Sequence, residues 1–538
     1  MKSKPGKRYR TLLVTGRSCC RWLGVSLLLF LCLSPVVTAE GAGEVSAPHA
    51  LVLTLALAWL LPLGLTLLAV GGSQQEHAPD VAVAALAAVA LSLLGYLVSG
   101  FAFQYGGLSL VAAVPGLERF VAEWSPFAGA RSADWGIIGL HGFLLQDPDL
   151  DTRAYTFFLL QWLPALTATL IPLVAVARKV PSYALLLVAL LVSGALYPLY
   201  GNWIWGGGWL AHLGQTVGWG HGAVDFAGSG TVFALGGGVA LALLASAAMQ
   251  RPRVKTRGTT PLPPVHFPLF MILGAFVALA GSWALFLANP LLSAADIHPV
   301  TVVSNITFAA AGGLLLPLLY TWFVAGRPDA LMTARGLVAG LVAIAAGAAF
   351  VPGWAALATG MVAGALLPPV HYVVTRLLQW SDETAVAGTF VVPGYWGLLA
   401  VGLFASGRWG IGWNGTGAEA HLGVSGQGVS GYWADALYLA DWPGQFLAQL
   451  AALFALLTLS FIVPYLLLTV PIQVGSRLWR ARQEHRPLPA TSSPEEPITT
   501  LSAASEAEEM ILTIPAVDEQ VPEEKQGEAA ADVTSVDV

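Results

Sequence analysis

Charged side chains are scarce in this chain, and their scarcity excludes a soluble globular protein. They make up 10% of the 538 residues, whereas hydrophobic residues make up 56%, and a soluble domain usually carries about 25% charged residues. Apolar runs of about 20 residues recur along the sequence, which is the length that a helix needs to cross a bilayer. We therefore predict an all-α membrane protein that crosses the lipid bilayer many times.

Cysteine is also nearly absent, and all three cysteines lie in a leader at the start of the chain. This leader has seven Lys/Arg in residues 2–21, followed by an apolar core up to Val37. The pattern is typical of a secretory signal peptide. We expect residues 1–39 to be a signal peptide that is removed, with a retained signal anchor as the alternative. Removal would leave no cysteine, and therefore neither a disulfide nor thiol chemistry.

The end of the chain lacks aromatic residues and nearly all basic ones. Residues 491–538 hold 12 Asp/Glu and one lysine. Such a composition cannot bury enough apolar surface to offset the conformational entropy of the chain. We expect residues 487–538 to be a disordered acidic tail on the cytoplasmic side. The tail is either solvated without a specific partner or regulatory.

No set of metal ligands, phosphate-binding loop or catalytic nucleophile stands out in the sequence. The glycine runs at 206–208 and 236–238 lack the strand and helix context of nucleotide-binding loops. His212 and His221 flank a Trp/Gly-rich loop, where histidines usually have no specific role. The sequence therefore predicts no enzyme, no metal or other cofactor, and no nucleic-acid partner.

Eleven apolar windows are candidates for membrane spans. They lie near residues 50–70, 81–106, 156–177, 183–200, 223–248, 266–288, 300–323, 331–350, 354–377, 387–406 and 442–470. Glycine and proline are frequent inside them, which membrane helices tolerate. We take residues 50–470 as one transmembrane domain.

Basic residues are distributed unevenly over the loops between these windows. If the N-terminus is outside, the inside loops and the start of the tail hold 13 Lys/Arg, and the outside loops hold 4. Cytoplasmic loops of membrane proteins carry such an excess of basic residues. We expect a multi-pass protein of the cytoplasmic membrane, with the N-terminus outside and the C-terminus cytoplasmic.

Two stretches in opposite halves of the chain share one skeleton. Asp225 precedes Phe233 by eight residues, and Asp382 precedes Phe390 by the same distance. The stretches fall in the fifth and tenth windows, which have opposite topology in this orientation. Matched segments of this kind indicate an inverted five-helix repeat with a central pathway. The eleventh window is then an additional C-terminal helix. Both aspartates also suit the N-terminal caps of their helices.

Two further motifs lie before and within the first stretch. They are Trp205-Gly-Gly-Gly-Trp-Leu-Ala-His-Leu-Gly and His221-Gly-Ala-Val-Asp-Phe-Ala-Gly-Ser-Gly-Thr-Val. Together they resemble the signature of the ammonium transporter family (Amt/Mep/Rh). Weaker matches keep the order of this family at Leu94–Phe103, Leu160–Gln161 and Trp396–Ala405. The resemblance covers about residues 50–470 and implies a homotrimer with one pore in each subunit.

The resemblance also implies which residues line the transport pathway. Family members place a histidine pair in the pore, and its positions correspond to Phe233 and Phe390 here. The family's pair of phenylalanines over the pore mouth corresponds to Pro164 and to either Leu285 or Phe286. The remaining pathway residues implied by the resemblance are Gln161, Trp205, Asp225 and Asn289.

We expect an ammonium/ammonia transporter or channel in which the cation loses its proton at the mouth and neutral ammonia passes an apolar pore. Phenylalanine holds no exchangeable proton, so a channel for another small neutral solute is one alternative. If the two rings instead fill a closed pore, the protein is a non-conducting receptor or scaffold. The family's tail motif for a cytoplasmic signal-transduction protein is not recognisable after Val474, so the sequence gives no support for that partner.

Overall fold

The computed structural model describes residues 47–112, 114, 116–127, 135–147, 150–250, 266–288 and 297–484. The expected signal peptide, the acidic tail and Asn289 lie outside the described residues. The chain divides into one unit that ends at Val474 and a second unit from Gly475, of which only the end of the last helix is described.

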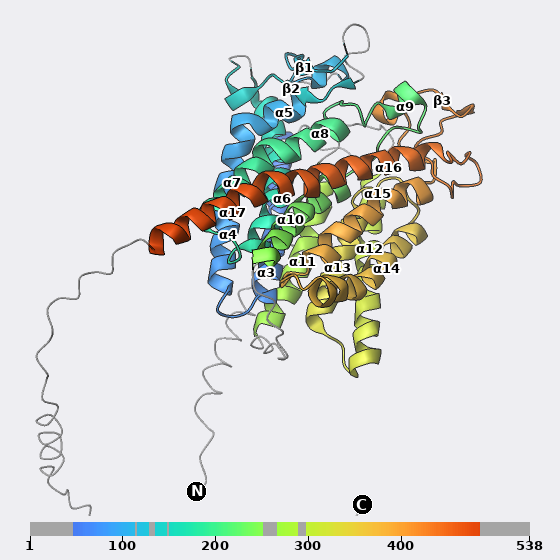
Figure 1. Ribbon diagram of the computed structural model, residues 1–538. Helices are drawn as coiled ribbons and strands as arrows, with labels where there is room; N and C mark the ends of the chain where they lie inside the picture. The colour runs from blue at the N-terminus through green and yellow to red at the C-terminus, as the bar shows by residue number, and fades with distance from the viewer. Residues whose placement is uncertain are drawn as a thin grey trace, which may run out of the picture. The chain divides into compact units, whose positions relative to one another are not determined.

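Helices dominate the first half of the larger unit (Figure 1). The structure has α2 (Ala47–Ala58), α3 (Leu60–Gly72), α4 (Ala78–Gly95) with the π-turn η1 (Tyr96–Gly100) and α5 (Phe101–Tyr105), α6 (Thr152–Val176), α7 (Ser182–Leu191) with η5 (Val192–Leu196) and α8 (Tyr197–Trp205), and η6 (Ser229–Ala234) with α10 (Leu235–Gln250). These elements correspond to the first five expected spans.

The second half repeats this series of spans and adds one more. It has α11 (His266–Leu287), α12 (Pro299–Ala325), α13 (Ala330–Ile344), α14 (Gly353–Tyr372) with η7 (Val373–Leu377), η8 (Ala387–Val391) with α15 (Val392–Phe404), and α16 (Gly444–Leu457) with η10 (Thr458–Ile462) and α17 (Val463–Glu484). Within the described residues, ten helices are long and apolar enough to cross a membrane, and α13 is a shorter apolar helix. The expected all-α membrane fold is confirmed.

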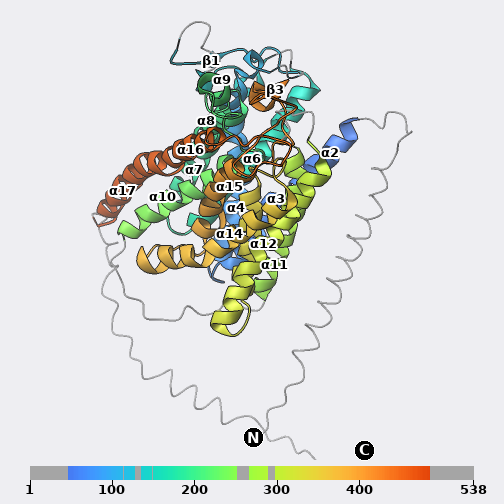
Figure 2. The same cartoon turned by 90° about the vertical axis from the view of Figure 1, so that its right-hand side faces the viewer.

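Short elements gather at one end of the larger unit, which we call the loop-rich end (Figures 1 and 2). They are the antiparallel strands β1 (Glu123–Trp124) and β2 (Ile138–Gly139), the helix α9 (Leu213–Val217), the antiparallel strands β3 (Ala420–His421) and β4 (Val424–Ser425), and the 3₁₀ turns η2 (Leu108–Leu110), η4 (Phe143–Leu145) and η9 (Trp413–Gly415). These short elements lie in the loops that connect the helices at this end.

Two of the expected spans are shorter than predicted, and for the same reason. The window 223–248 becomes helical only at Ser229, and the window 331–350 stops being helical after Ile344. The two non-helical segments bind each other, because the Phe226 and Ala227 amides donate to the carbonyls of Ala346 and Ala345 at 3.1 and 2.8 Å. Backbone that leaves the helix inside a membrane protein needs such internal partners.

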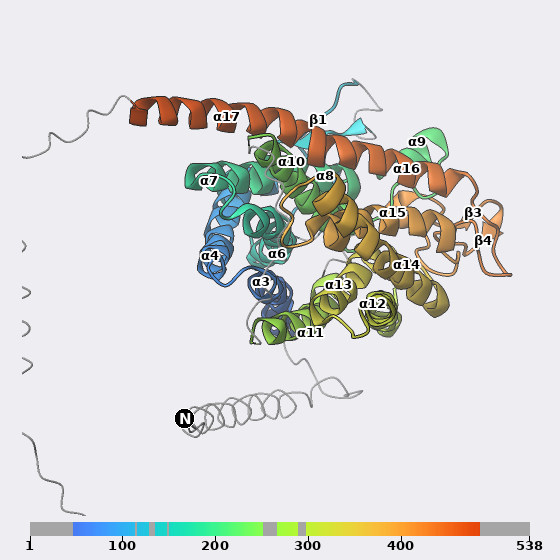
Figure 3. The same ribbon diagram turned by 60° about the horizontal axis from the view of Figure 1, so that its bottom comes forward.

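Helix α3 of the first half packs along α11, the first helix of the second half (Figures 2 and 3). Glycines allow their backbones to touch. A Cβ atom on Gly64 would lie 2.6 Å from the Gly274 carbonyl oxygen, and a Cβ atom on Gly274 would lie 2.6 Å from the Gly64 carbonyl oxygen. Small residues permit this close approach where membrane helices associate. Neither position therefore accepts a side chain without separating the two helices.

Glu123 on β1 connects the loop-rich end to α8. Its Oε1 accepts a hydrogen bond of 3.1 Å from Asn202 Nδ2, whereas its Oε2 is buried without a hydrogen-bond partner. Burial raises the pKa of Glu123 to about 7, although the Asn202 hydrogen bond lowers it. Because the folded-state pKa lies above the unfolded value of 4.5, the folded protein holds more protons between these pH values. Its stability therefore falls as pH rises through this window.

We predict that Glu123→Gln raises the unfolding temperature at pH 8 and leaves it nearly unchanged at pH 5, where both side chains are neutral. The gain at pH 8 should be on the order of 1–2 kcal/mol. Thermal unfolding of the purified protein in detergent, measured at both pH values, checks this. The matched control is Glu419→Gln, which changes an exposed glutamate at the same end. An equal shift at both pH values would contradict the assigned cause.

Candidate functional site

Phe233 and Phe390 meet in the interior between the two halves. Their ring centroids are 6.4 Å apart with an interplanar angle of 11°, so the rings are stacked with an offset. Phe286 from α11 lies edge-on to Phe233, with a centroid distance of 6.4 Å. Phe233 is fully buried and Phe390 is 6% exposed. The symmetric phenylalanines of the sequence are therefore neighbours in space.

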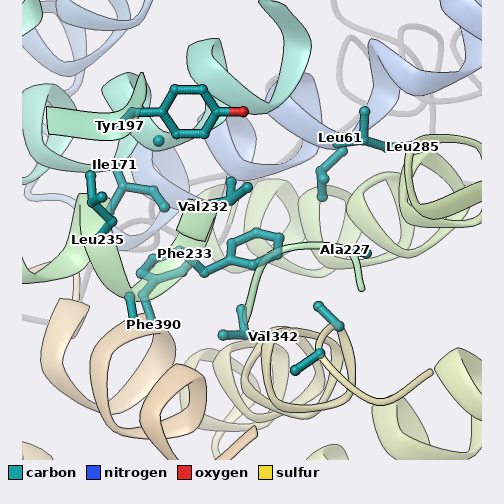
Figure 4. Close-up of a cluster of buried hydrophobic side chains, with 14 of the residues drawn as sticks. Leu61, Ile171, Tyr197, Ala227, Val232, Phe233, Leu235, Leu285, Val342 and Phe390 are labelled. Atoms are coloured by element: carbon teal, nitrogen blue, oxygen red, sulfur yellow. The ribbon is translucent and has the colours of Figure 1, made fainter. Parts of the chain in front are cut away.

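The surroundings of this phenylalanine pair are apolar. Figure 4 shows the buried cluster, whose labelled members around the pair include Leu61, Ile171, Leu235, Leu285 and Val342. The only polar atom among the labelled side chains is the Tyr197 hydroxyl oxygen. An apolar pocket of about 20 Å³ reaches Phe390, which is room for about one water molecule. Phe390 is the member of the pair that lines this pocket.

A larger pocket of about 270 Å³ lies at the end opposite the loop-rich end and shares Val174 and Thr384 with the apolar pocket. Its polar lining is mainly basic. Arg178 and Lys179 follow α6, and Glu383 supplies the carboxylate that His77 Nδ1 approaches at 3.2 Å and Lys179 Nζ at 3.9 Å. This basic vestibule therefore opens toward Phe390.

Asp225 and Asp382 cap the two matched helices in similar ways. Asp225 Oδ2 accepts hydrogen bonds from the amides of Gly230 and Thr231 at 3.1 and 2.8 Å, and from the Thr231 hydroxyl at 2.7 Å. Asp382 Oδ1 accepts from the Val386 amide at 2.9 Å and its Oδ2 from the next amide at 3.2 Å. Carboxylates suit helix N-termini because they pair with amides that have no partner in the helix. The matched caps place each phenylalanine one to two turns into its helix.

Trp205 lies directly beside Asp225. Its indole Nε1 donates a hydrogen bond of 2.7 Å to the Asp225 carbonyl oxygen. Gly228 has φ +93°, and a Cβ atom there would lie 3.2 Å from the Trp205 ring. The left-handed backbone and the close ring both require glycine at this position. Asp225 Oδ1 is buried and has no hydrogen-bond partner among the described residues, so one carboxylate oxygen of the residue that Trp205 contacts is left unpaired.

Two glutamines of α16 hold the non-helical segment that leads to Asp225. Gln445 Oε1 accepts from the His221 amide at 2.9 Å, and Gln445 Nε2 donates to the Gly222 carbonyl at 2.9 Å. One turn later, Gln449 Oε1 accepts from the Val224 amide and its Nε2 donates to the Val224 carbonyl, both at 2.7 Å. These two glutamines were not predicted from the sequence. Their spacing was a usable signal, because polar residues four positions apart lie on the same face of an apolar helix.

Gln161 lies in a separate buried hydrogen-bond chain. Its Oε1 accepts from the Tyr105 hydroxyl at 2.8 Å, and Tyr105 in turn accepts from Gln104 Nε2 at 2.9 Å. Gln104 Oε1 accepts from the Tyr96 hydroxyl at 2.9 Å. The structure thus brings Trp205 together with Asp225, and Phe233 together with Phe390. It places Gln161 in a network of η1, α5 and α6 residues.

We predict that Gln449→Leu lowers the free energy of unfolding by about 2–3 kcal/mol, because it leaves the buried Val224 amide and carbonyl without partners. Thermal or denaturant unfolding of the purified protein in detergent measures the loss. The control is Gln215→Leu, since the exposed Gln215 donates a similar bond of 2.8 Å to the Asn414 carbonyl. That change should cost at most about 0.5 kcal/mol. Equal losses in both variants would show that burial of the segment is not the cause.

Known proteins share this architecture and sequence. The sequence profile of the Ammonium Transporter Family matches residues 49–484. The ammonium transporter Amt2 of Archaeoglobus fulgidus is 33% identical over 364 residues, which are 66% of this chain and 70% of that protein. An ammonium transporter of Bacillus subtilis is 27% identical over 353 residues, which are 65% of this chain and 78% of that protein.

Solved structures show the same fold. A protein described as a sensor Amt protein has a TM-score of 0.61 at 23% identity, with 79% of this chain and 92% of that chain covered. Candida albicans Mep2 also has a TM-score of 0.61, at 21% identity, with 80% of this chain and 84% of that chain covered. With its spans, its matched helix caps and a profile match over most of its length, this chain belongs to the ammonium transporter family.

Proposed function

We propose that this protein moves ammonium across the cell membrane by releasing a proton at the loop-rich end and passing neutral ammonia between the two halves. The observation that carries this proposal is the stacked, buried pair of Phe233 and Phe390 in an apolar surrounding. Phenylalanine neither accepts nor donates a proton. A path that narrows at this pair therefore favours a small neutral molecule over an ion.

The charged groups at the two ends bear on where the ammonium ion would release its proton. At the loop-rich end, Asp225 Oδ1 has no hydrogen-bond partner among the described residues, and the Trp205 indole contacts the Asp225 backbone. Both a carboxylate and an indole face attract an ammonium-like cation. At the opposite end, Arg178 and Lys179 line the vestibule, where Arg178 pairs with Asp80 at 3.1 Å and Lys179 lies 3.9 Å from Glu383. These basic groups are thus paired with carboxylates, and the attraction of a cation comes from the loop-rich end.

Passage requires the phenylalanine pair to move. The pocket beside Phe390 holds about 20 Å³, and Phe233 is fully buried behind it. Hydrophobic constrictions of this kind gate by excluding water. A rotation of one or both rings is the smallest change that would extend the pocket from Phe390 toward Trp205. Any ion that followed would lose its hydration without a polar replacement, which is costly.

The orientation and assembly belong to the same proposal. The vestibule end carries Arg178 and Lys179, in agreement with a cytoplasmic location for that end. The loop-rich end with Trp205 then faces outward, with the N-terminus outside and the C-terminus cytoplasmic. We assign the functional unit as a homotrimer on the basis of the family, with one pathway in each subunit.

A second candidate function is a non-conducting receptor. The closed ring pair favours it, and so does the structural similarity to a protein described as a sensor Amt protein. In that case the phenylalanine pair is permanent core packing. A channel for another small neutral solute is a third outcome of the same test.

We predict that proteoliposomes with the wild-type protein take up ammonia faster than empty liposomes, measured as internal alkalinisation by stopped flow. Phe233→His/Phe390→His should also conduct, and it should additionally carry charge, because facing imidazoles offer a proton path. The charge is measured as current on a solid-supported membrane. Wild-type uptake without current, together with uptake and current in the double variant, is the expected pair of results.

The control is Phe127→His, which changes an exposed phenylalanine at the loop-rich end and should behave as the wild type. Alkalinisation no faster than in empty liposomes, appearing only in the double variant, would refute the transport proposal and favour the receptor. Wild-type passage of another neutral solute without ammonia passage would favour the third outcome.

A further inference from the structure

We infer that His221, His421 and Asp441 form a zinc-binding site at the loop-rich end. One ligand atom from each of the three side chains lies within 4.8 Å of those from the other two. Two imidazole nitrogens with one carboxylate oxygen are a donor set that Zn²⁺ prefers, with water in the fourth position. The site is separate from the phenylalanine pair and does not depend on the proposed transport.

The distances between the three side chains are close to those around a tetrahedrally coordinated zinc ion. His421 Nε2 and Asp441 Oδ2 are 2.8 Å apart, and the two imidazole centroids are 4.3 Å apart with an interplanar angle of 53°. Ligand atoms at about 2.0–2.1 Å from zinc in a tetrahedral site are about 3.4 Å from one another. Small side-chain rotations would therefore bring the three donors to these distances without a change of the backbone.

The strongest evidence is the state of His221. Its side chain is fully buried, and neither Nδ1 nor Nε2 has a hydrogen-bond partner in the described part of the chain. A neutral imidazole always carries one N–H group and one lone pair, and leaving such polar groups buried and unpaired destabilises the folded protein. Coordination of a metal ion would use the lone pair that the protein leaves without a partner.

Two of the three ligands, His221 and Asp441, are held by backbone hydrogen bonds. The His221 amide donates to Gln445 Oε1 at 2.9 Å, and the His221 carbonyl accepts from Asn414 Nδ2 at 2.9 Å. The Asp441 carbonyl accepts from the Gln445 amide at 3.1 Å. Gln445 thus fixes the backbone on both sides of the site, and such support preorganises ligands.

Glycine leaves space beside the two imidazoles. A Cβ atom on Gly417 would lie 2.9 Å from the Cβ of His421 and 3.4 Å from His221 Nε2. The φ of +68° at Gly417 also requires glycine. A larger residue would push His421 away from His221, so the loop is built to let the two rings approach.

Binding would replace the hydrogen bond between His421 and Asp441. The ion would take the position of the proton between Nε2 and the carboxylate. A neutral His421 would carry that proton on Nδ1 instead, and a protonated His421 would keep its Nδ1 proton and release the Nε2 proton to solvent. The ligands come from the segment before Asp225 and from two points in the loop before α16. Zinc would therefore cross-link these two parts of the loop-rich end. The competing explanation is a plain His–Asp hydrogen bond beside an inert histidine.

The test is a zinc titration of the full-length protein in detergent after removal of metals with EDTA. Calorimetry should show one Zn²⁺ per chain, and Asp441→Asn or His421→Asn should weaken binding at least tenfold. The matched control is His141→Gln. His141 forms a similar pair with Asp147 at 3.1 Å at the same end, and no second histidine joins it among the described residues that can group around a metal. This variant should bind zinc as tightly as the wild type.

Cobalt binding by the wild type tests the site even if a variant fails to fold. Size-exclusion chromatography would reveal such a failure. Bound Co²⁺ should give the intense visible absorption of a tetrahedral site, and added Zn²⁺ should abolish it. A weak octahedral spectrum, or zinc affinity that is the same in the wild type and Asp441→Asn, would overturn the site and leave the plain hydrogen bond.

Discussion

The buried backbone of residues 220–228 has to find hydrogen-bond partners inside the protein, because lipid supplies none. It finds them in the side chains of α16 and in the carbonyl groups that follow α13. These partners in turn decide where the neighbouring helices stop. Asp225 and Ser229 then start a new helix at a fixed place, and the position of Phe233 follows from that start.

The same frame separates polar from apolar surroundings along the axis of the molecule. Polar groups are concentrated where the chain is non-helical, around Asp225 and Glu383. Between these two places the matched helices present mainly aliphatic and aromatic side chains, with the buried Thr389 hydroxyl as a polar exception. The fold therefore surrounds the phenylalanine pair with few groups that could hold an ion.

Much of this arrangement follows from the sequence. The apolar windows predicted the order and type of the helices, and the equal spacing of Asp225 and Asp382 from their phenylalanines predicted two matched segments. Whether the rings of Phe233 and Phe390 meet was left open by the sequence. The ends of the windows at 223 and 350 were wrong because both segments are as apolar as the helices they adjoin. Hydrogen bonds between the two segments, and from the first segment to the α16 glutamines, are made outside the helical pattern. His221 and His421 are 200 positions apart in the sequence. No local pattern connects them, so their meeting is visible only in three dimensions.

The contact between Gly64 and Gly274 limits how this protein can work. Where two backbones touch, no layer of side chains remains on which the halves could slide. Rocking of whole domains occurs over microseconds to milliseconds, whereas single side chains reorient within nanoseconds. Because the two halves are in direct backbone contact here, we expect the pathway to open by movement of side chains and not by rocking of the halves. Its throughput should then rise in proportion to the concentration gradient, as in a pore, instead of reaching the plateau of a carrier that must reset after each passage.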